Sequence, residues 1–266
     1  MNELEVKELI VSTIAKEVAI TNTKTRYRQP LISFAKVRND DFRQLKEIVG
    51  DHHLMPDDIL HGAQTMVVFF LPFSEEVVRA NRQSPYVARE WAVAYVETNN
   101  LISRICEVLV QSLKEIGIEA AFERPTYNFD KEKLVSRWSH KSIAALAGLG
   151  SFGLNKMLIT DSGCTGRFGS LLLKTKLYPS VREPKERCLY FYDGSCQKCI
   201  NSCPVNAIKE DGEFDRAACY KYLLEVDAFF NDLPLTEVCG KCSVGMPCSL
   251  RSAVKHSKSE KVSISD

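Results

Sequence analysis

The stretch Cys188 to Ile208, CLYFYDGSCQKCINSCPVNAI, decides how the rest of this chain is interpreted. Four cysteines fall within it, and the last, Cys203, is followed by Pro204. Clustered thiols are typical of a disulfide framework, a zinc site or the ligands of an iron–sulfur cluster. The composition and the other cysteines help to separate these interpretations.

The composition is that of an ordinary globular protein. Of the 266 residues, 45% are hydrophobic and 26% are charged, and the formal net charge is +1. This length allows one large domain or two smaller ones. The near-neutral charge and the lack of an arginine-rich tract argue against a nucleic-acid partner.

No segment of the sequence predicts a membrane span or a secretory signal. The longest apolar run, Met66 to Phe73, is too short to cross a bilayer. The N-terminus is acidic from Glu3 onward, unlike a signal peptide. An amphipathic helix is expected there, with an apolar face of Leu4, Leu9, Ile10, Ile14 and Val18. We therefore expect a cytoplasmic protein, in which disulfides are rare.

The eight cysteines between Cys188 and Cys248 form two similar halves, whereas Cys106 and Cys164 stand alone. Each half has a lone cysteine, a C-x-x-C pair and a trailing cysteine. The first half consists of Cys188, Cys196, Cys199 and Cys203, and the second of Cys219, Cys239, Cys242 and Cys248. Eight thiols in one short region of an intracellular chain indicate metal.

The first half follows the bacterial ferredoxin run C-x-x-C-x-x-C-x-x-x-C-P, whose last cysteine serves the other cluster. The run is intact from Cys196 to Pro204, while Asp193 stands where its leading cysteine belongs and Cys188 substitutes for it. In the second half the trailing cysteine is not followed by proline. We predict two [4Fe–4S] clusters with interleaved ligands, the first cysteine set being Cys188, Cys196, Cys199 and Cys248 and the second cysteine set Cys203, Cys219, Cys239 and Cys242.

The residues ahead of the cysteines predict an α/β (α+β) domain. A buried strand is expected over Met66 to Phe73, where Pro72 should end it. Helices are expected over 86–116 and 136–146, and strands over 118–123, 156–160 and 170–177. The proline-containing segment 178–187 indicates a linker. The predicted parts are an α/β domain with a cofactor or substrate pocket (1–180), a ferredoxin-like dicluster domain (181–255) and a frayed tail (256–266).

Gly148, Gly150 and Gly153 match the dinucleotide-binding pattern G-x-G-x-x-G. That pattern binds phosphates when a strand leads into it and a helix leaves it, but here the predicted order is reversed. A helix stop and close backbone packing explain Gly148 and Gly150 better. Gly150 and Gly153 are kept only as cofactor-binding candidates beside Arg167.

The segment AGLGSFGLNKMLIT (147–160), followed by the dicluster cysteine region, resembles the epoxyqueuosine reductase family and related corrinoid iron–sulfur reductases. TMVVFFLPF ahead of a long helix is also similar to that family's N-terminal part, so the resemblance runs from about Leu54 to Cys248. It implies an α/β domain related to flavin nitroreductase-like folds, packed against a two-cluster ferredoxin module. It also implies cobalamin in the first domain, with clusters that feed electrons to cobalt.

Three features depart from that family. The aspartate that serves the family as proton donor falls on Leu134, and the nearest acids are Asp130 and Glu132. A helical-repeat extension after the clusters and a basic surface, both expected of members that act on transfer RNA, are not found in the sequence. We therefore expect a divergent short branch of the family.

Two further residues are candidates for a site in the first domain. His140 is suited to proton donation or to the lower face of cobalt. Arg167 lies among glycines, where it would meet a cofactor phosphate or carboxylate. The alternatives are a histidine packed beside Trp138 and an arginine that anchors a loop. Cys106 and Cys164 are expected to be small buried residues.

The leading hypothesis is a cytosolic iron–sulfur oxidoreductase or electron-transfer protein, whose two clusters serve a site in the N-terminal domain. Its partner would be a redox protein or a small-molecule substrate. A cobalamin-dependent reductase that resembles epoxyqueuosine reductase is the second hypothesis. A zinc-stabilised binding module, in which eight thiolates hold two zinc ions, is the third.

Overall fold

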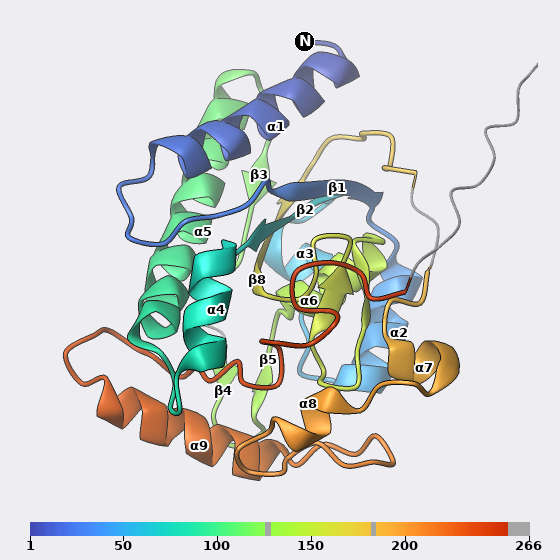
Figure 1. Cartoon of the computed structure of the whole chain (residues 1–266). Coiled ribbons are helices and arrows are strands. Elements are labelled where there is room, and N and C mark those ends of the chain that lie inside the picture. Colours follow the sequence, from blue (N-terminus) through green and yellow to red (C-terminus); the bar gives the residue numbers. More distant parts are fainter. Residues whose placement is uncertain (126–128, 182–184, 255–266) are drawn as a thin grey trace, which may run out of the picture.

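A four-stranded antiparallel sheet forms the centre of the computed structural model, which describes residues 1–125, 129–181 and 185–254 (Figure 1). The strands run in the order β1 (Leu31–Lys36), β2 (Thr65–Pro72), β8 (Gly166–Leu173) and β3 (Ala120–Ala121). Two small hairpins pair β4 (Phe129–Asp130) with β5 (Val135–Ser136) and β6 (Gly150–Phe152) with β7 (Leu158–Thr160). Because all pairings are antiparallel, the mixed helix and strand pattern gives an α+β arrangement.

Helices cover both faces of this sheet. Helices α1 (Glu3–Ile20) and α5 (Arg89–Glu115) pack on one face, and α2 (Asn39–Val49) and α6 (His140–Leu146) pack on the other. The other helices are α3 (Pro56–Ile59), α4 (Glu75–Gln83), α7 (Leu189–Asp193), α8 (Lys198–Asn201) and α9 (Arg216–Phe229). The predicted helix over 86–116 is confirmed as α5, and Gly117 follows it with a φ of 79°.

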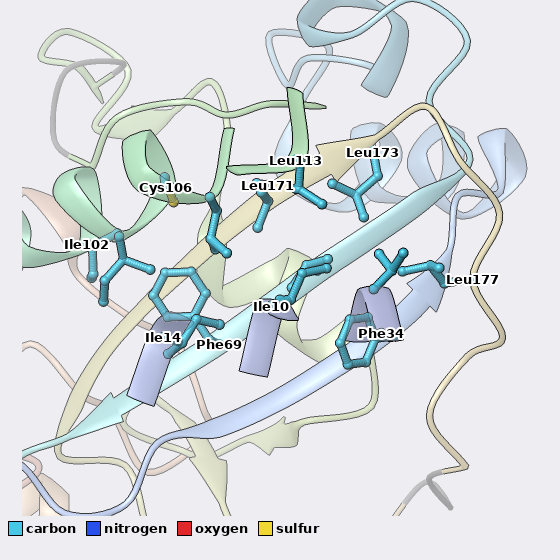
Figure 2. Packing of buried hydrophobic residues seen from close by; sticks show 14 of the residues in the cluster. Ile10, Ile14, Phe34, Phe69, Ile102, Cys106, Leu113, Leu171, Leu173 and Leu177 are labelled. Atoms are coloured by element: carbon cyan, nitrogen blue, oxygen red, sulfur yellow. The ribbon is translucent and has the colours of Figure 1, made fainter. Parts of the chain in front are cut away.

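Strand β2 is buried along its whole length because its side chains alternate between two cores. Val67 and Phe69 join the core built with α1 and α5, and Figure 2 shows Phe69 beside Ile14 and Ile102. Met66 and Val68 join a second core, which includes residues of α2 and α6. Two covered faces explain why the predicted strand is one unbroken apolar run.

Strand β8 begins at Gly166, within the segment predicted as a glycine-rich turn, and ends before the predicted limit of residue 177. Gly169 pairs with Phe69, and a Cβ at this glycine would lie 2.3 Å from the Phe69 ring. The glycine therefore lets an aromatic ring of the neighbouring strand lie across β8.

Three other predicted elements differ in extent. The helix predicted over 136–146 begins at His140, because Val135–Ser136 pairs with β4. The strand predicted over 118–123 is reduced to Ala120–Ala121. Helix α1 buries Val6, Ile10 and Ile14, whereas Leu4 is 65% exposed. The buried face of the helix is therefore rotated about the helix axis relative to the predicted apolar face.

The cysteine-bearing part packs directly on the N-terminal part. Val226 and Phe230, from the region of α9, share a third core with Trp91 of α5 and Val78 of α4. Residues 182–184 of the predicted linker and the predicted tail 256–266 lie outside the described residues, and a boundary near residue 180 stays a prediction. Within the described ranges, no helix combines the length and apolarity needed to cross a membrane.

Candidate metal centre

The first cysteine set lines a single hollow, to which Cys188, Cys196, Cys199 and Cys248 all contribute. Cys188 caps the N-terminus of α7 and Cys199 lies in α8. Cys248 reaches the hollow from the loop after α9, so both halves of the repeat contribute. Ile159 and Met246 also line it, and they give the hollow an apolar wall.

The thiols of the second cysteine set raise one another's pKa, so these cysteines lie close together. Burial first, and then the thiols of Cys219 and Cys203, raise the pKa of Cys239 to about 11. Burial also raises the pKa of the Cys242 thiol, and Cys239, Cys219 and Cys203 act on it in the same direction. Such thiols are protonated at neutral pH without a cation, so a metal centre bound here would displace protons.

The two sets lie next to each other. Burial, followed by Cys248, Cys188 and Cys196, raises the pKa of Cys199 to about 11. Cys199 in turn contributes to the raised pKa of Cys242, which belongs to the second set. Centres held by these sets would therefore be close enough for mutual electrostatic influence.

All ten cysteines are free thiols in this structure. Cys106 of α5 lies in the core that α1 and α5 share, where Figure 2 shows it near Ile102, and its predicted burial is confirmed. Cys164 is also buried, with its Sγ 3.9 Å from the Ser243 carbonyl oxygen. Over the described residues, no three His, Cys, Asp or Glu side chains form a site for a single metal ion.

The second C-x-x-C pair is fixed to the N-terminal part. Asn81 is fully buried, and its Nδ2 donates to the carbonyl oxygen of Cys239 over 2.9 Å. Lys241 Nζ donates to the carbonyl oxygens of Asn81 and Ser84 over 2.6 and 2.7 Å. Gly240, between the two cysteines, has a φ of 72°, and a Cβ there would lie 2.3 Å from the Trp91 ring. The loop therefore needs glycine both for its backbone and for its contact with α5.

Asn155 connects both cysteine sets with the N-terminal part. Its Nδ2 donates to the carbonyl oxygen of Cys242 over 2.9 Å, and its side chain also lines the hollow of the first set. Nearby, the backbone N–H of Cys164 donates to the carbonyl oxygen of Cys248 over 3.0 Å. Thr165 Oγ1 donates to the Ser249 carbonyl oxygen over 2.7 Å.

His140 lies in a hydrogen-bond network with Trp138 and Ser170. The Ser170 hydroxyl accepts from Trp138 Nε1 over 3.0 Å and lies 2.8 Å from His140 Nδ1. When the hydroxyl donates to Nδ1, the hydrogen of the neutral imidazole is on Nε2, and when it accepts from Nδ1–H, Nε2 has no hydrogen. This Nε2 is buried and has no hydrogen-bond partner among the described residues; the Glu123 carbonyl is near enough to affect the pKa but not in hydrogen-bonding geometry. Burial, followed by the charge of Arg167, lowers the pKa of His140 to about 4, so the ring is neutral at pH 7.

Arg167 and Lys141 bring positive charge to the same region. The Arg167 guanidinium lies 4.3 Å from the centre of the Tyr95 ring, a cation–π contact. Lys141 Nζ donates to the carbonyl oxygen of Lys156 over 3.2 Å. Burial, followed by the charge of Arg167, lowers the pKa of Lys141, while Cys242 and Cys219 of the second set act in the opposite direction. We call His140, Lys141 and Arg167 the donor group.

The glycine candidates are not part of this group. A Cβ on Gly150 would lie 2.3 Å from the Ile159 carbonyl oxygen, and one on Gly153 would lie 2.8 Å from the Ile159 side chain. Both positions serve the close β6–β7 hairpin, in agreement with the packing interpretation. Their assignment to cofactor binding stays an untested prediction.

Leu134 occupies a turn with a φ of 54°, next to β5. Asp130 Oδ1 accepts from the backbone N–H groups of Glu132 and Lys133 over 3.0 and 2.9 Å, which holds this turn together. Sequence reasoning missed Asn155, Lys141 and Tyr95. For Lys141, the sequence offered only its position next to His140. Tyr95 belongs to the apolar repeat of a long helix, which predicts burial but not a contact with Arg167.

The sheet, its helices and the cysteine-bearing part together define the class of fold. This is the mixed α/β fold of the epoxyqueuosine reductases and reductive dehalogenases. An epoxyqueuosine reductase structure with an epoxyqueuosine-modified tRNA-Tyr stem loop matches with a TM-score of 0.61 at 17% identity, over 93% of this chain and 66% of that chain. A reductive dehalogenase structure that suggests a mechanism for B12-dependent dehalogenation matches with a TM-score of 0.56 at 15% identity, over 86% of this chain and 30% of that chain.

In sequence the chain is similar to epoxyqueuosine reductases, which confirms the predicted resemblance. The enzyme of Bacillus anthracis is 22% identical over 181 residues, which cover 65% of this chain and 43% of the relative. The match thus spans less than half of that relative's length. No family model matches the chain. The tRNA stem loop belongs to that structural neighbour, and the absence of a nucleic-acid partner for this chain stays a prediction.

Proposed function

We propose that this chain is a cytoplasmic iron–sulfur reductase in which the two cysteine sets hold two [4Fe–4S] clusters that serve a site in the N-terminal domain. The observation that carries the proposal is the shared hollow of the first set. Cys248 comes from the far end of the module, yet it lines the same hollow as Cys188, Cys196 and Cys199. This is the interleaving expected of two-cluster ferredoxins.

The cysteine pattern favours a polynuclear cluster over zinc. The run C-x-x-C-x-x-x-C-P from Cys196 to Pro204 follows the bacterial ferredoxins, whose last cysteine serves the other cluster. The four cysteines of the first set line one hollow, as the ligands of one such group would. Thiols are also the ligands that iron–sulfur clusters use.

The residues around the sets suggest a direction for electrons. When bound, such clusters transfer electrons at potentials set by hydrogen bonds, charge and solvent exposure. Lys141 is electrostatically coupled to Cys219 and Cys242, so the second set is the one adjacent to the donor group. The first set lies beside α7, where Phe191 is 50% exposed, and this face would receive a redox partner protein.

A cobalamin-dependent reductase acting on a small molecule is the second candidate, because the fold is similar to that of the B12-related dehalogenase structure. His140 stays a candidate cobalt ligand, because a neutral imidazole binds metal through the nitrogen without hydrogen, and Nε2 has no hydrogen when Nδ1 donates to the Ser170 hydroxyl. Leu134 has no proton to donate, so protons for such a reaction would come from elsewhere in the site.

The deciding experiment is metal and cofactor analysis of protein purified without air. Two clusters predict a brown protein with a broad absorption shoulder that dithionite bleaches, and equal amounts of iron and sulfide. A colourless protein that contains two zinc ions per chain would overturn the proposal in favour of a binding module. Cobalamin that co-elutes and changes its spectrum on binding would identify the second candidate.

A further inference from the structure

The edge of β8 that faces away from β2 is left open over most of its length. β8 pairs with β2 from Gly166 to Leu173, but β3 covers only Leu172 and Leu173 on the other side. In the described part of the chain no other strand pairs with the remaining edge. Side chains from both faces of the sheet can therefore meet there.

The side chains of Arg167 and Ser170 project from opposite faces of β8, because side chains alternate along a strand. Ser170 is the hydrogen-bond partner of His140. Arg167 is opposite Leu71 and contacts Tyr95 of α5, on the face that α5 covers. Ser170 is opposite Val68 and contacts His140, on the face that α6 covers. The donor group thus brackets the open edge from both sides.

The donor group has hydrogen-bond donors and positive charge, and the acidic groups that act on Lys141 are the Cys242 and Cys219 thiols of the second set. Within the described ranges, neither Arg167 nor Lys141 forms an ion pair with a carboxylate. When its hydrogen is on Nε2, His140 presents a buried N–H that has no acceptor in the same residues. A buried donor left unmet costs about 1–3 kcal/mol, so an acceptor supplied by a ligand would be favoured.

We propose that the donor group binds an anionic oxygen group of a ligand, a carboxylate or a phosphate, at the open edge of β8. Arg167 supplies a planar guanidinium that matches two oxygens, and His140 in its Nε2–H tautomer supplies a third donor from the other side. His140, Lys141 and Arg167 are each partly accessible, while His140 Nε2 itself is buried, so a ligand would approach Arg167 and Lys141 first. This inference rests on the proposed function in one respect: it takes the donor group to be the site that the clusters serve and names the chemistry of its ligand.

The test is calorimetric titration of the anaerobically purified full chain with sodium benzoate, inorganic phosphate and, as a neutral control, benzyl alcohol. Wild-type protein is expected to bind at least one of the two anions and not the alcohol. Arg167→Gln should weaken that binding at least tenfold, and His140→Leu about fivefold. His140→Gln, which keeps an N–H donor, should recover part of the loss. Binding of benzoate alone assigns a carboxylate ligand, and binding of phosphate alone assigns a phosphate ligand.

Arg79→Gln is the matched control, because it removes an exposed arginine on α4 and lowers the net charge equally. Equal affinities of Arg79→Gln and Arg167→Gln, or wild-type protein that binds neither anion, would overturn the anion site. Iron and sulfide are measured in the same preparations. Anion binding by a zinc-loaded chain would support this site while it overturned the proposed function, so the two failures are distinguishable.

Discussion

The sheet domain and the cysteine-bearing module are held together by different means. Helix α5 of the sheet domain buries eleven of its residues, ten of them apolar or aromatic together with Thr98. In the module, α7 buries none, α8 buries Cys199 alone and α9 buries Val226 alone. Burial of apolar surface is the main stabilising effect in the first region. If the second region binds the proposed clusters, it would depend on their ligands and on its contacts with the first region.

Removal of one proposed ligand should have the largest effect on this comparison. Cys199→Ser is expected to lose at least half of the bound iron and to unfold much of the module, because metal-binding energy is folding energy in such sites. Iron analysis and limited proteolysis measure both effects. Cys106→Ala is the control, since its sulfur lies in the other region. Normal iron content in Cys199→Ser, or iron loss in Cys106→Ala, would show that the ligands are assigned wrongly.

A substitution in the core of the sheet should lower the stability of the protein and leave its iron content unchanged. Phe69→Ala removes a fully buried ring and is expected to lower the free energy of unfolding by about 3–5 kcal/mol. The iron content per folded molecule should stay the same, because no cysteine of either set is in that core. Urea unfolding, with iron analysis of the folded fraction, tests this. Loss of iron from folded Phe69→Ala protein would show that the sheet core also supports the metal sites.

The junction between the regions should respond less strongly. Gly240→Ala places a side chain in the left-handed region and against Trp91, and we expect a loss of about 2–4 kcal/mol with faster iron release to a chelator. Gly212→Ala is the matched control. Its φ is 88°, yet a Cβ there has nothing within 4 Å, so it carries the backbone strain without the overlap. Equal iron release from the two variants would remove Trp91 as a support of the second set.

The smallest effect is expected from the titration of His140. Its pKa is about 4 in the folded chain and 6.5 ordinarily, so the unfolded chain binds a proton more readily between these values. The stability that depends on the neutral ring is complete above pH 6.5 and is lost as the pH falls toward 4. Between pH 7.5 and pH 5, wild-type protein should lose about 2 kcal/mol more than His140→Asn in urea unfolding. Identical pH dependence of the two proteins would contradict a buried neutral imidazole.

The sequence was informative where a local pattern sufficed. Strand β2 and helix α5 were predictable because their apolar residues follow one another at the spacing of the element itself. The grouping of the eight cysteines was predictable from their repeat, although their roles as ligands stay proposed. These features depend on neighbours a few residues apart in the chain.

The rest depends on contacts between distant segments. The start of β8 was missed because Gly169 is required by Phe69, a hundred residues earlier. The donor group was not predictable as a unit, since Arg167 and His140 approach from different faces of the sheet. Asn155 looked like an ordinary turn residue until its amide was found on the Cys242 carbonyl.

The double contact of Asn155 has a consequence for biosynthesis. This residue precedes all eight clustered cysteines in the chain, so a ribosome completes its segment before the first of them emerges. The nascent sheet domain can therefore offer a ready-made cradle on which both cysteine sets assemble as they are translated. Metal would then bind after the sheet domain has folded, and a substitution of Asn155 would affect both cysteine sets.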